Sequence, residues 1–190
     1  MDTIHPNRVA LDHPLGRRIA IFGRAGKTSL AKAIANKHDL EFIEVDWIHF
    51  MPDWQERSDD EILEIVTGKM DGSEAGWVVD HQWRSVVSAV LERADTLILI
   101  NLPWRTLFWM YVKRSIRRSW TGELMAGGNK ETWRLSFASR DSHLWHVIKT
   151  RKNNYRARFE PELSEGMAYY LIESLSELNR FYAVHQLTRR

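Results

Sequence analysis

The chain has 190 residues, a formal net charge of +2, and hydrophobic and charged fractions of 44% and 27%, as expected for one globular domain. It contains no cysteine, which excludes a disulfide framework and a cysteine-based zinc site. The longest clean apolar run, 97–100, is too short to cross a bilayer, and residues 1–15 lack a secretory apolar stretch, so we expect a cytoplasmic protein without a membrane partner.

Short apolar strands and amphipathic helices alternate along the chain. Apolar runs bounded by turn residues predict strands at 18–23, 41–45, 77–80, 96–102 and 169–172. Helical spacing of apolar residues predicts helices at 27–38, 58–70, 84–94, 104–119, 142–158 and 176–185. Residues 120–140, rich in Gly, Asn and Ser, are expected to form an irregular, mobile excursion.

Strands separated by helices predict an α/β fold, with a parallel sheet covered on both faces. No composition shift divides the chain, so we expect an N-terminal extension at 1–16 and one domain at 17–190. Ligands of such sheets bind at the carboxyl ends of the strands. That rule directs attention to the residues after the first four predicted strands.

The turn after the first strand has the residues of a phosphate-binding loop. Such a loop needs small residues that turn backbone N–H groups inward, a Lys for the β- and γ-phosphates, and a Ser or Thr hydroxyl for Mg²⁺. The candidates are Gly23, Arg24, Ala25, Gly26, Lys27, Thr28 and Ser29.

This loop is shorter than the full pattern G-x-x-x-x-G-K-[ST]. Only Arg24 and Ala25 separate Gly23 from Gly26, so the loop lacks two residues of the usual nest of N–H groups. We therefore expect weak ATP binding, and a chance match to the motif remains the alternative.

A second candidate cluster follows the strand predicted at 41–45. Asp46 could accept the proton of a substrate hydroxyl or hold a metal-bound water, although an acidic cap of the turn is the alternative role. Trp54 could stack on a base or sugar, although tryptophans more often serve in packing.

A third cluster follows the strand predicted at 77–80. Asp80 could orient Mg²⁺ through water, and Arg84 could bind a phosphate through two hydrogen bonds. Gln82 lies between them and is a candidate substrate contact.

Positive charge is concentrated in one part of the chain. Residues 113–158 contain twelve Lys and Arg residues against three Asp and Glu, so the remainder of the chain is acidic. A basic segment on an acidic protein predicts an anionic partner, either a phosphorylated small molecule or nucleic acid. The alternative is a solvated helix face.

The order of these motifs resembles that of adenylate-kinase-like small P-loop kinases, a group that includes bacterial proteins often labelled topology modulation proteins. The similarity runs from about Arg18 to the end of the chain. It is carried by the strand and GKT turn at 19–31, by Glu44, Asp46, Pro52 and Trp54, by 80–83, by 93–103, and by the Arg-rich stretch at 113–131.

The resemblance implies a three-layer P-loop NTPase fold with a five-stranded parallel sheet and an Arg-rich lid at about 113–158. It implies ATP-dependent phosphoryl transfer to a small acceptor, with nucleotides among the candidates, and ATP and Mg²⁺ as cofactors. Lys27 would be catalytic, Thr28 and Asp80 would hold the metal, and Asp46 would face the acceptor. Five lid residues would close over the phosphates: Arg114, Arg117, Arg118, Arg134 and Arg140.

The runner-up is a different class of protein. A P-loop fold that has lost turnover could act as a binding module, using its basic segment to bind nucleic acid.

Overall fold

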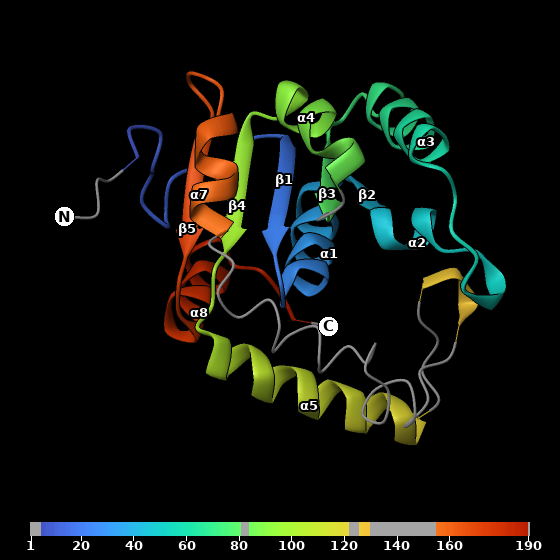
Figure 1. Ribbon diagram of the computed structural model, residues 1–190. Helices are drawn as coiled ribbons and strands as arrows, with labels where there is room; N and C mark the ends of the chain where they lie inside the picture. Colours follow the sequence, from blue (N-terminus) through green and yellow to red (C-terminus); the bar gives the residue numbers. More distant parts are fainter. Residues whose placement is uncertain (1–4, 81–83, 122–125, 130–154, 190) are drawn as a thin grey trace.

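Five strands form the centre of the molecule in the computed structural model, which describes residues 5–80, 84–121, 126–129 and 155–189 (Figure 1). The strands are β1 (Arg18–Gly23), β2 (Glu41–Glu44), β3 (Trp77–Asp80), β4 (Thr96–Ile100) and β5 (Ala168–Ile172). Their order across the sheet is β2-β3-β1-β4-β5, and every adjacent pair is parallel. The predicted α/β class and all-parallel sheet are therefore confirmed.

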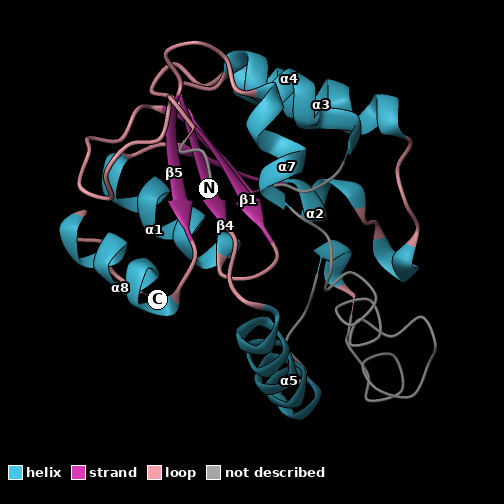
Figure 2. Ribbon diagram, turned by 60° about the vertical axis from the view of Figure 1, so that its left-hand side comes forward, coloured by secondary structure: helices cyan, strands magenta, loops and turns pink. Residues whose placement is uncertain are grey.

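Helices cover both faces of this sheet (Figure 2). One face carries α1 (Lys27–His38) and α8 (Leu175–Val184). The other carries α3 (Asp59–Asp71), α4 (Arg84–Arg93) and α7 (Tyr155–Phe159). The longest helix, α5 (Trp104–Thr121), runs below the carboxyl ends of the strands in Figure 1. None of the helices described here is long and apolar enough to cross a membrane.

The apolar runs become strands because both faces of the sheet are covered. In β1, Ile19 and Ile21 pack on the side of α1, whereas Ala20 and Phe22 pack on the side of α3 and α4. All four side chains are fully buried. A strand buried on both faces needs a continuous apolar run rather than alternation, which is the pattern that the sequence has.

The chain around residue 45 differs from the prediction. β2 ends at Glu44 instead of residue 45, and the short helix α2 (Val45–His49) begins directly after it. Val45, Ile48 and His49 have helical spacing, and Val45 and Ile48 pack against the core below α3. Burial of these side chains favours a helical turn over a longer strand, so Asp46 lies in a helix rather than in a loop.

The other boundaries agree with the prediction to within two residues. The described residues also form three short 3-10 helices that were not predicted. These are η1 (Pro52–Trp54), η2 (Ala126–Gly128) and η5 (Glu160–Glu162). Of the helix predicted at 142–158, only its end is described, as part of α7. Most of the expected excursion and lid lies outside the described residues.

The N-terminal segment 5–15 packs along the free edge of β5. The N–H of Val9 donates to the carbonyl oxygen of Tyr169, and the N–H of Tyr169 donates to that of Asn7, both at 2.9 Å. The hydroxyl of Tyr170 donates to the carbonyl oxygen of His13 at 2.7 Å. The segment therefore covers a sheet edge that would otherwise present unpaired backbone groups.

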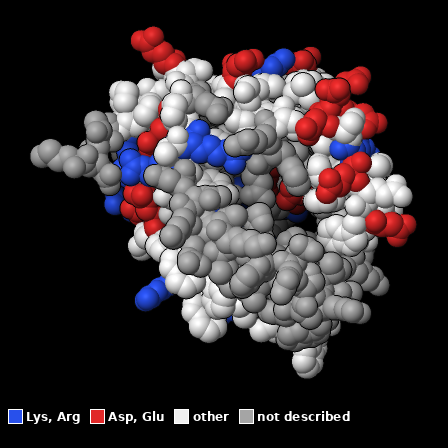
Figure 3. All heavy atoms as spheres, in the orientation of Figure 1, with Lys and Arg blue, Asp and Glu red and all other residues white. Residues whose placement is uncertain are grey.

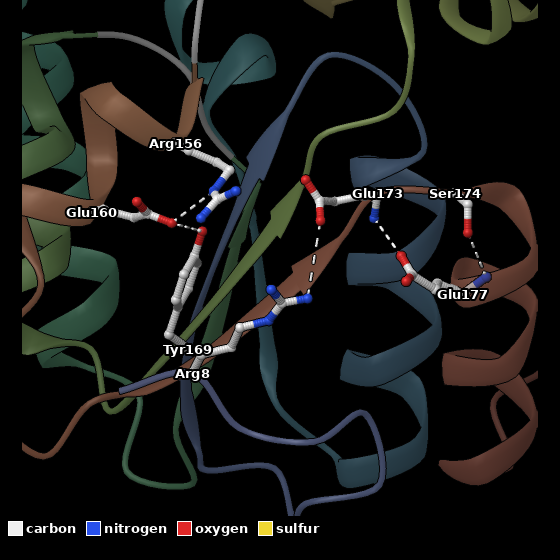
Figure 4. A network of polar contacts seen from close by, with 7 residues as sticks. All are labelled: Arg8, Arg156, Glu160, Tyr169, Glu173, Ser174 and Glu177. Carbon is white, nitrogen blue, oxygen red and sulfur yellow. Dashed lines mark hydrogen bonds and ion pairs between the residues drawn. The ribbon is translucent and has the colours of Figure 1, made fainter. Parts of the chain in front are cut away.

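Side chains around β5 form a network of polar contacts (Figure 4). The hydroxyl of Tyr169 donates to Glu160 at 3.1 Å, and Arg156 donates to the same carboxylate at 2.9 Å. Arg8 lies 4.0 Å from Glu173, beyond the end of β5. Burial, followed by the charge of Glu160, raises the pKa of Tyr169 far above its usual value, so this hydroxyl stays a donor. These contacts fix α7 against the sheet.

Candidate functional site

The turn between β1 and α1 depends on two glycines. Gly23 has φ of 138° and Gly26 has φ of 84°, a region that other residues rarely adopt. A Cβ on Gly23 would also overlap the carbonyl oxygen of Ile100 on the neighbouring strand. No side chain caps the N-terminus of α1, so its first backbone N–H groups face the turn without a side-chain acceptor.

Lys27 and Thr28, the first two residues of α1, meet Asp80 at the end of β3. The Lys27 Nζ atom lies 3.2 Å from Oδ1 of Asp80, and the Thr28 hydroxyl donates to Oδ2. The side chains of Lys27 and Asp80 are only 8% and 4% exposed. The register that places Ile21 opposite Asp80 brings these residues together, because β1 and β3 end at the same edge.

The environment keeps Lys27 positively charged. Burial alone would lower the pKa of Lys27, but the carboxylates of Asp80 and Asp46 outweigh that effect, and the pKa is raised. Burial also raises the pKa of Glu44, against the opposing effect of Lys32. The protonated Lys27 therefore lies close to two carboxylates, Asp80 of β3 and Asp46 of α2.

Asp46 and Trp54 come from the region after β2. Asp46 lies in the first turn of α2. Trp54 lies in η1, where its backbone N–H donates to Oδ1 of Asn129 at 3.1 Å and its ring makes an edge-to-face contact with Phe50. The ring of Trp54 therefore packs against Phe50, and its stacking on a ligand stays a prediction.

Asn129 was not predicted as a site residue, yet it organises this turn. Its side chain is buried, and its NH₂ group donates to the carbonyl oxygens of Met51 at 3.0 Å and Ala126 at 2.8 Å. Asp53 and Trp54 have φ values of 59° and 57° inside the turn. The resemblance placed Asn129 in the lid segment but could not show that it bonds to η1.

Arg24 contacts the start of α7. Its guanidinium lies 4.9 Å from the centre of the Tyr155 ring, a cation–π contact with the start of α7. A small pocket beside it is lined by Asn101, Leu102 and Trp104, among others. No motif marks Tyr155, so sequence reasoning had no signal with which to find this contact.

The expected arginines are only partly described. Arg114 is exposed on α5, lies 4.9 Å from the Tyr111 ring, and is close enough to act on the pKa of Lys27. Arg118 is half-buried on the same helix, and Arg84 begins α4. The predicted residues Gln82, Arg134 and Arg140 lie outside the described residues.

The oxygen groups present suit Mg²⁺ better than a metal that needs many protein ligands. No group of three or more His, Asp or Glu side chains in the described segments could hold a metal ion. Mg²⁺ commonly binds through one or two carboxylates together with water and substrate phosphates. Asp80 and the Thr28 hydroxyl are such a set, so these residues fit a metal that arrives with a nucleotide.

Comparisons with known proteins do not identify a family for this chain. The chain matches no protein-family model, and no curated protein matches it.

Proposed function

We propose that the protein is a cytoplasmic P-loop phosphotransferase that moves the γ-phosphoryl group of ATP to a small acceptor, with nucleotides among the candidates. The proposal rests on the contacts of Lys27 and Thr28, at the start of α1, with the carboxylate of Asp80. These residues lie at the carboxyl edge of an all-parallel sheet, where such folds bind ligands.

Each residue has a role that its surroundings support. Bound Mg·ATP would supply the phosphoryl group and the charge of the metal. Lys27 contributes a positive charge that is held in place, which stabilises negative charge developing on the phosphate oxygens. Thr28 and Asp80 would provide oxygen ligands for the metal, and the uncapped N-terminus of α1 favours an anion. Asp46 is the candidate that accepts the proton of the acceptor hydroxyl.

The same geometry predicts weak binding. Lys27 is already bonded to Asp80, so a phosphate must compete with this buried ion pair. The two residues between Gly23 and Gly26 also provide fewer N–H groups than the usual loop. We expect a dissociation constant for Mg·ATP near the millimolar range, or about 4 kcal/mol.

Phosphoryl transfer to a panel of nucleoside monophosphates, followed as ADP formation, tests the proposal. With an acceptor that gives turnover, Asp46→Asn should reduce the rate far more than the affinity for Mg·ATP. Asp80→Asn should weaken the response to Mg²⁺ instead. Loss of ATP affinity to the same extent in both variants would show that the two acids do not have separate roles.

One observation favours the nucleic-acid alternative. Helix α5 contains no acidic residue, and the exposed Trp109 and Trp120 lie on the same face as Lys113 (61% and 90% exposed for the two tryptophans). Proteins that bind single strands combine aromatic stacking platforms with cations that contact the backbone. Figure 3 shows that acidic side chains instead gather on the side of α2 and α3.

A labelled single-stranded oligonucleotide distinguishes the two functions. A binding module should hold it with an affinity that falls steeply with salt and weakens in Trp109→Ala. If the oligonucleotide does not bind at low salt, the nucleic-acid alternative fails, and the phosphotransferase proposal is unaffected.

A further inference from the structure

The two edges of the sheet differ in what covers them. The backbone of β5 is paired by the chain's own N-terminal segment, through Asn7 and Val9. The opposite edge strand, β2, pairs only with β3, and no other described segment forms a ladder with it. Figure 1 shows β2 at this edge, on the side of α2.

The backbone of β2 presents hydrogen-bonding groups outward. The N–H of Glu41 donates to the carbonyl oxygen of Gly76 at 3.0 Å, so Glu41 faces β3. Successive residues of a strand alternate in direction, and the register pairs Phe42 with Val78. The N–H and C=O groups of Phe42 and the N–H of Glu44 therefore point away from the sheet, as a template for another strand, whereas the C=O of Glu44 starts the hydrogen bonding of α2.

A trough of about 400 Å³ runs along this edge. Lys32 of α1 borders it on one face of the sheet, and Lys69 of α3 borders it on the other. Between them the lining is largely apolar, with Phe42, Ile48 and the 46% exposed Trp47. The open edge is thus flanked by side chains that an added strand would contact.

The charges of the trough are balanced. Lysines commonly protect edge strands from association, but here Lys32 lies 3.5 Å from Glu44 and Lys69 lies 3.3 Å from Glu41. Each lysine is neutralised by a glutamate of β2 itself. The edge therefore carries no net charge, so two copies of the same edge would not repel each other.

We propose that two copies of this chain associate through β2, antiparallel about a two-fold axis, and so join their sheets into one. A second copy presents the same balanced lysines and glutamates, and a two-fold interface uses the same patch on both partners. The pairing brings the two Phe42 residues opposite each other. Because β2 has only four residues, the dimer forms few backbone hydrogen bonds, and its population depends on concentration.

Sedimentation of the full chain over about 1 to 500 µM tests the proposal, a range that spans weak to moderate affinity. The mean mass should rise from 22.4 kDa toward twice that value. Phe42→Ala and Phe42→Pro form the matched pair, because both lose the ring but only proline loses the outward N–H. Phe42→Pro should dimerise at least tenfold more weakly than Phe42→Ala.

Amide hydrogen exchange gives a second measurement that does not depend on the proline variant folding. Exchange at Phe42 and Glu44 should slow as the concentration of the wild-type chain rises. Three results would overturn the proposal: a mass that stays at 22.4 kDa, equal dimerisation of two folded Phe42 variants, or concentration-independent exchange at both amides.

Discussion

The ammonium group of Lys27 serves the proposed site and the fold at once. It lies 3.2 Å from Asp80, and both side chains are almost fully removed from solvent. A buried ion pair contributes little net stability, but removing one partner leaves an uncompensated charge inside the protein. The effects of Lys27 on binding and on stability must therefore be measured separately.

Lys27→Met should lower the free energy of unfolding by about 3 kcal/mol, because the Asp80 carboxylate stays buried without its cation. The double variant Lys27→Met with Asp80→Asn removes both charges and should recover most of that loss. Urea unfolding gives both values. Asp80→Asn alone completes the cycle, and a loss in the double variant equal to the sum of the two single losses would show that the pair is not energetically coupled.

His185 makes stability depend on pH. Burial lowers its pKa, although its ring nitrogen lies 2.8 Å from the carbonyl oxygen of Leu11 in the N-terminal segment, which opposes the shift. A histidine with a lowered pKa binds its proton more weakly in the folded state than in the unfolded state. The stability that neutral His185 provides is present above an unfolded pKa of about 6.5 and is lost as the pH falls below it.

The melting temperature of the wild-type chain should therefore fall between pH 7.5 and pH 5.5, and His185→Gln should reduce that fall. Glutamine can still donate to Leu11 but does not titrate in this range. Burial also lowers the pKa of His38, so some dependence should remain in the variant. An identical pH profile for the two proteins would contradict the assignment.

At the scale of elements, regular periodicity was more informative than local turns. The bounds of β1, α1 and β3 were predicted as observed. A buried apolar run or the apolar face of a helix is a pattern of residues that are close together in the sequence, so it can be recognised without the structure. η1 was missed because its conformation depends on Asn129, which is 75 residues from Trp54 in the chain. Tyr155 was missed for the same reason, since its contact with Arg24 is purely tertiary.

The phosphate-binding loop allows the most specific prediction for an element. Inserting Ser-Gly between Gly26 and Lys27 restores the full G-x-x-x-x-G-K-[ST] spacing and adds two backbone N–H groups. Affinity for Mg·ATP should increase at least tenfold, or about 1.4 kcal/mol.

A matched control inserts Ser-Gly between Gly72 and Ser73, in the turn after α3. It changes length but not the loop and should leave the affinity unchanged. Micromolar binding by the unmodified chain, with no gain on insertion at Gly26, would show that the short loop works as it is.

At the scale of the molecule, the sheet includes more of the chain than its five strands. Residues 5–15 were predicted as an extension, and the structure places them along β5, where they contribute backbone and side-chain hydrogen bonds. Sequence reasoning could not find this attachment, because the partners Arg8 and Tyr169 come from opposite ends of the chain.

Deleting residues 1–12 should lower the melting temperature and expose the edge of β5. The shortened chain should also associate through the exposed edge of β5. Sedimentation should detect this association as a mass that rises with concentration. The rise should persist when Phe42→Pro blocks the interface at β2. Unchanged stability together with an unchanged mass would show that the segment does not protect the sheet.

Isothermal titration calorimetry of the full chain with ATP, with and without Mg²⁺, tests the phosphate site most directly. We predict binding that requires Mg²⁺, has a dissociation constant near the millimolar range, and disappears in the double variant Lys27→Met with Asp80→Asn, whose fold is expected to be retained. No detectable binding at high millimolar Mg·ATP, or equal binding by that folded variant, would contradict the assignment of Lys27, Thr28 and Asp80 to a nucleotide site.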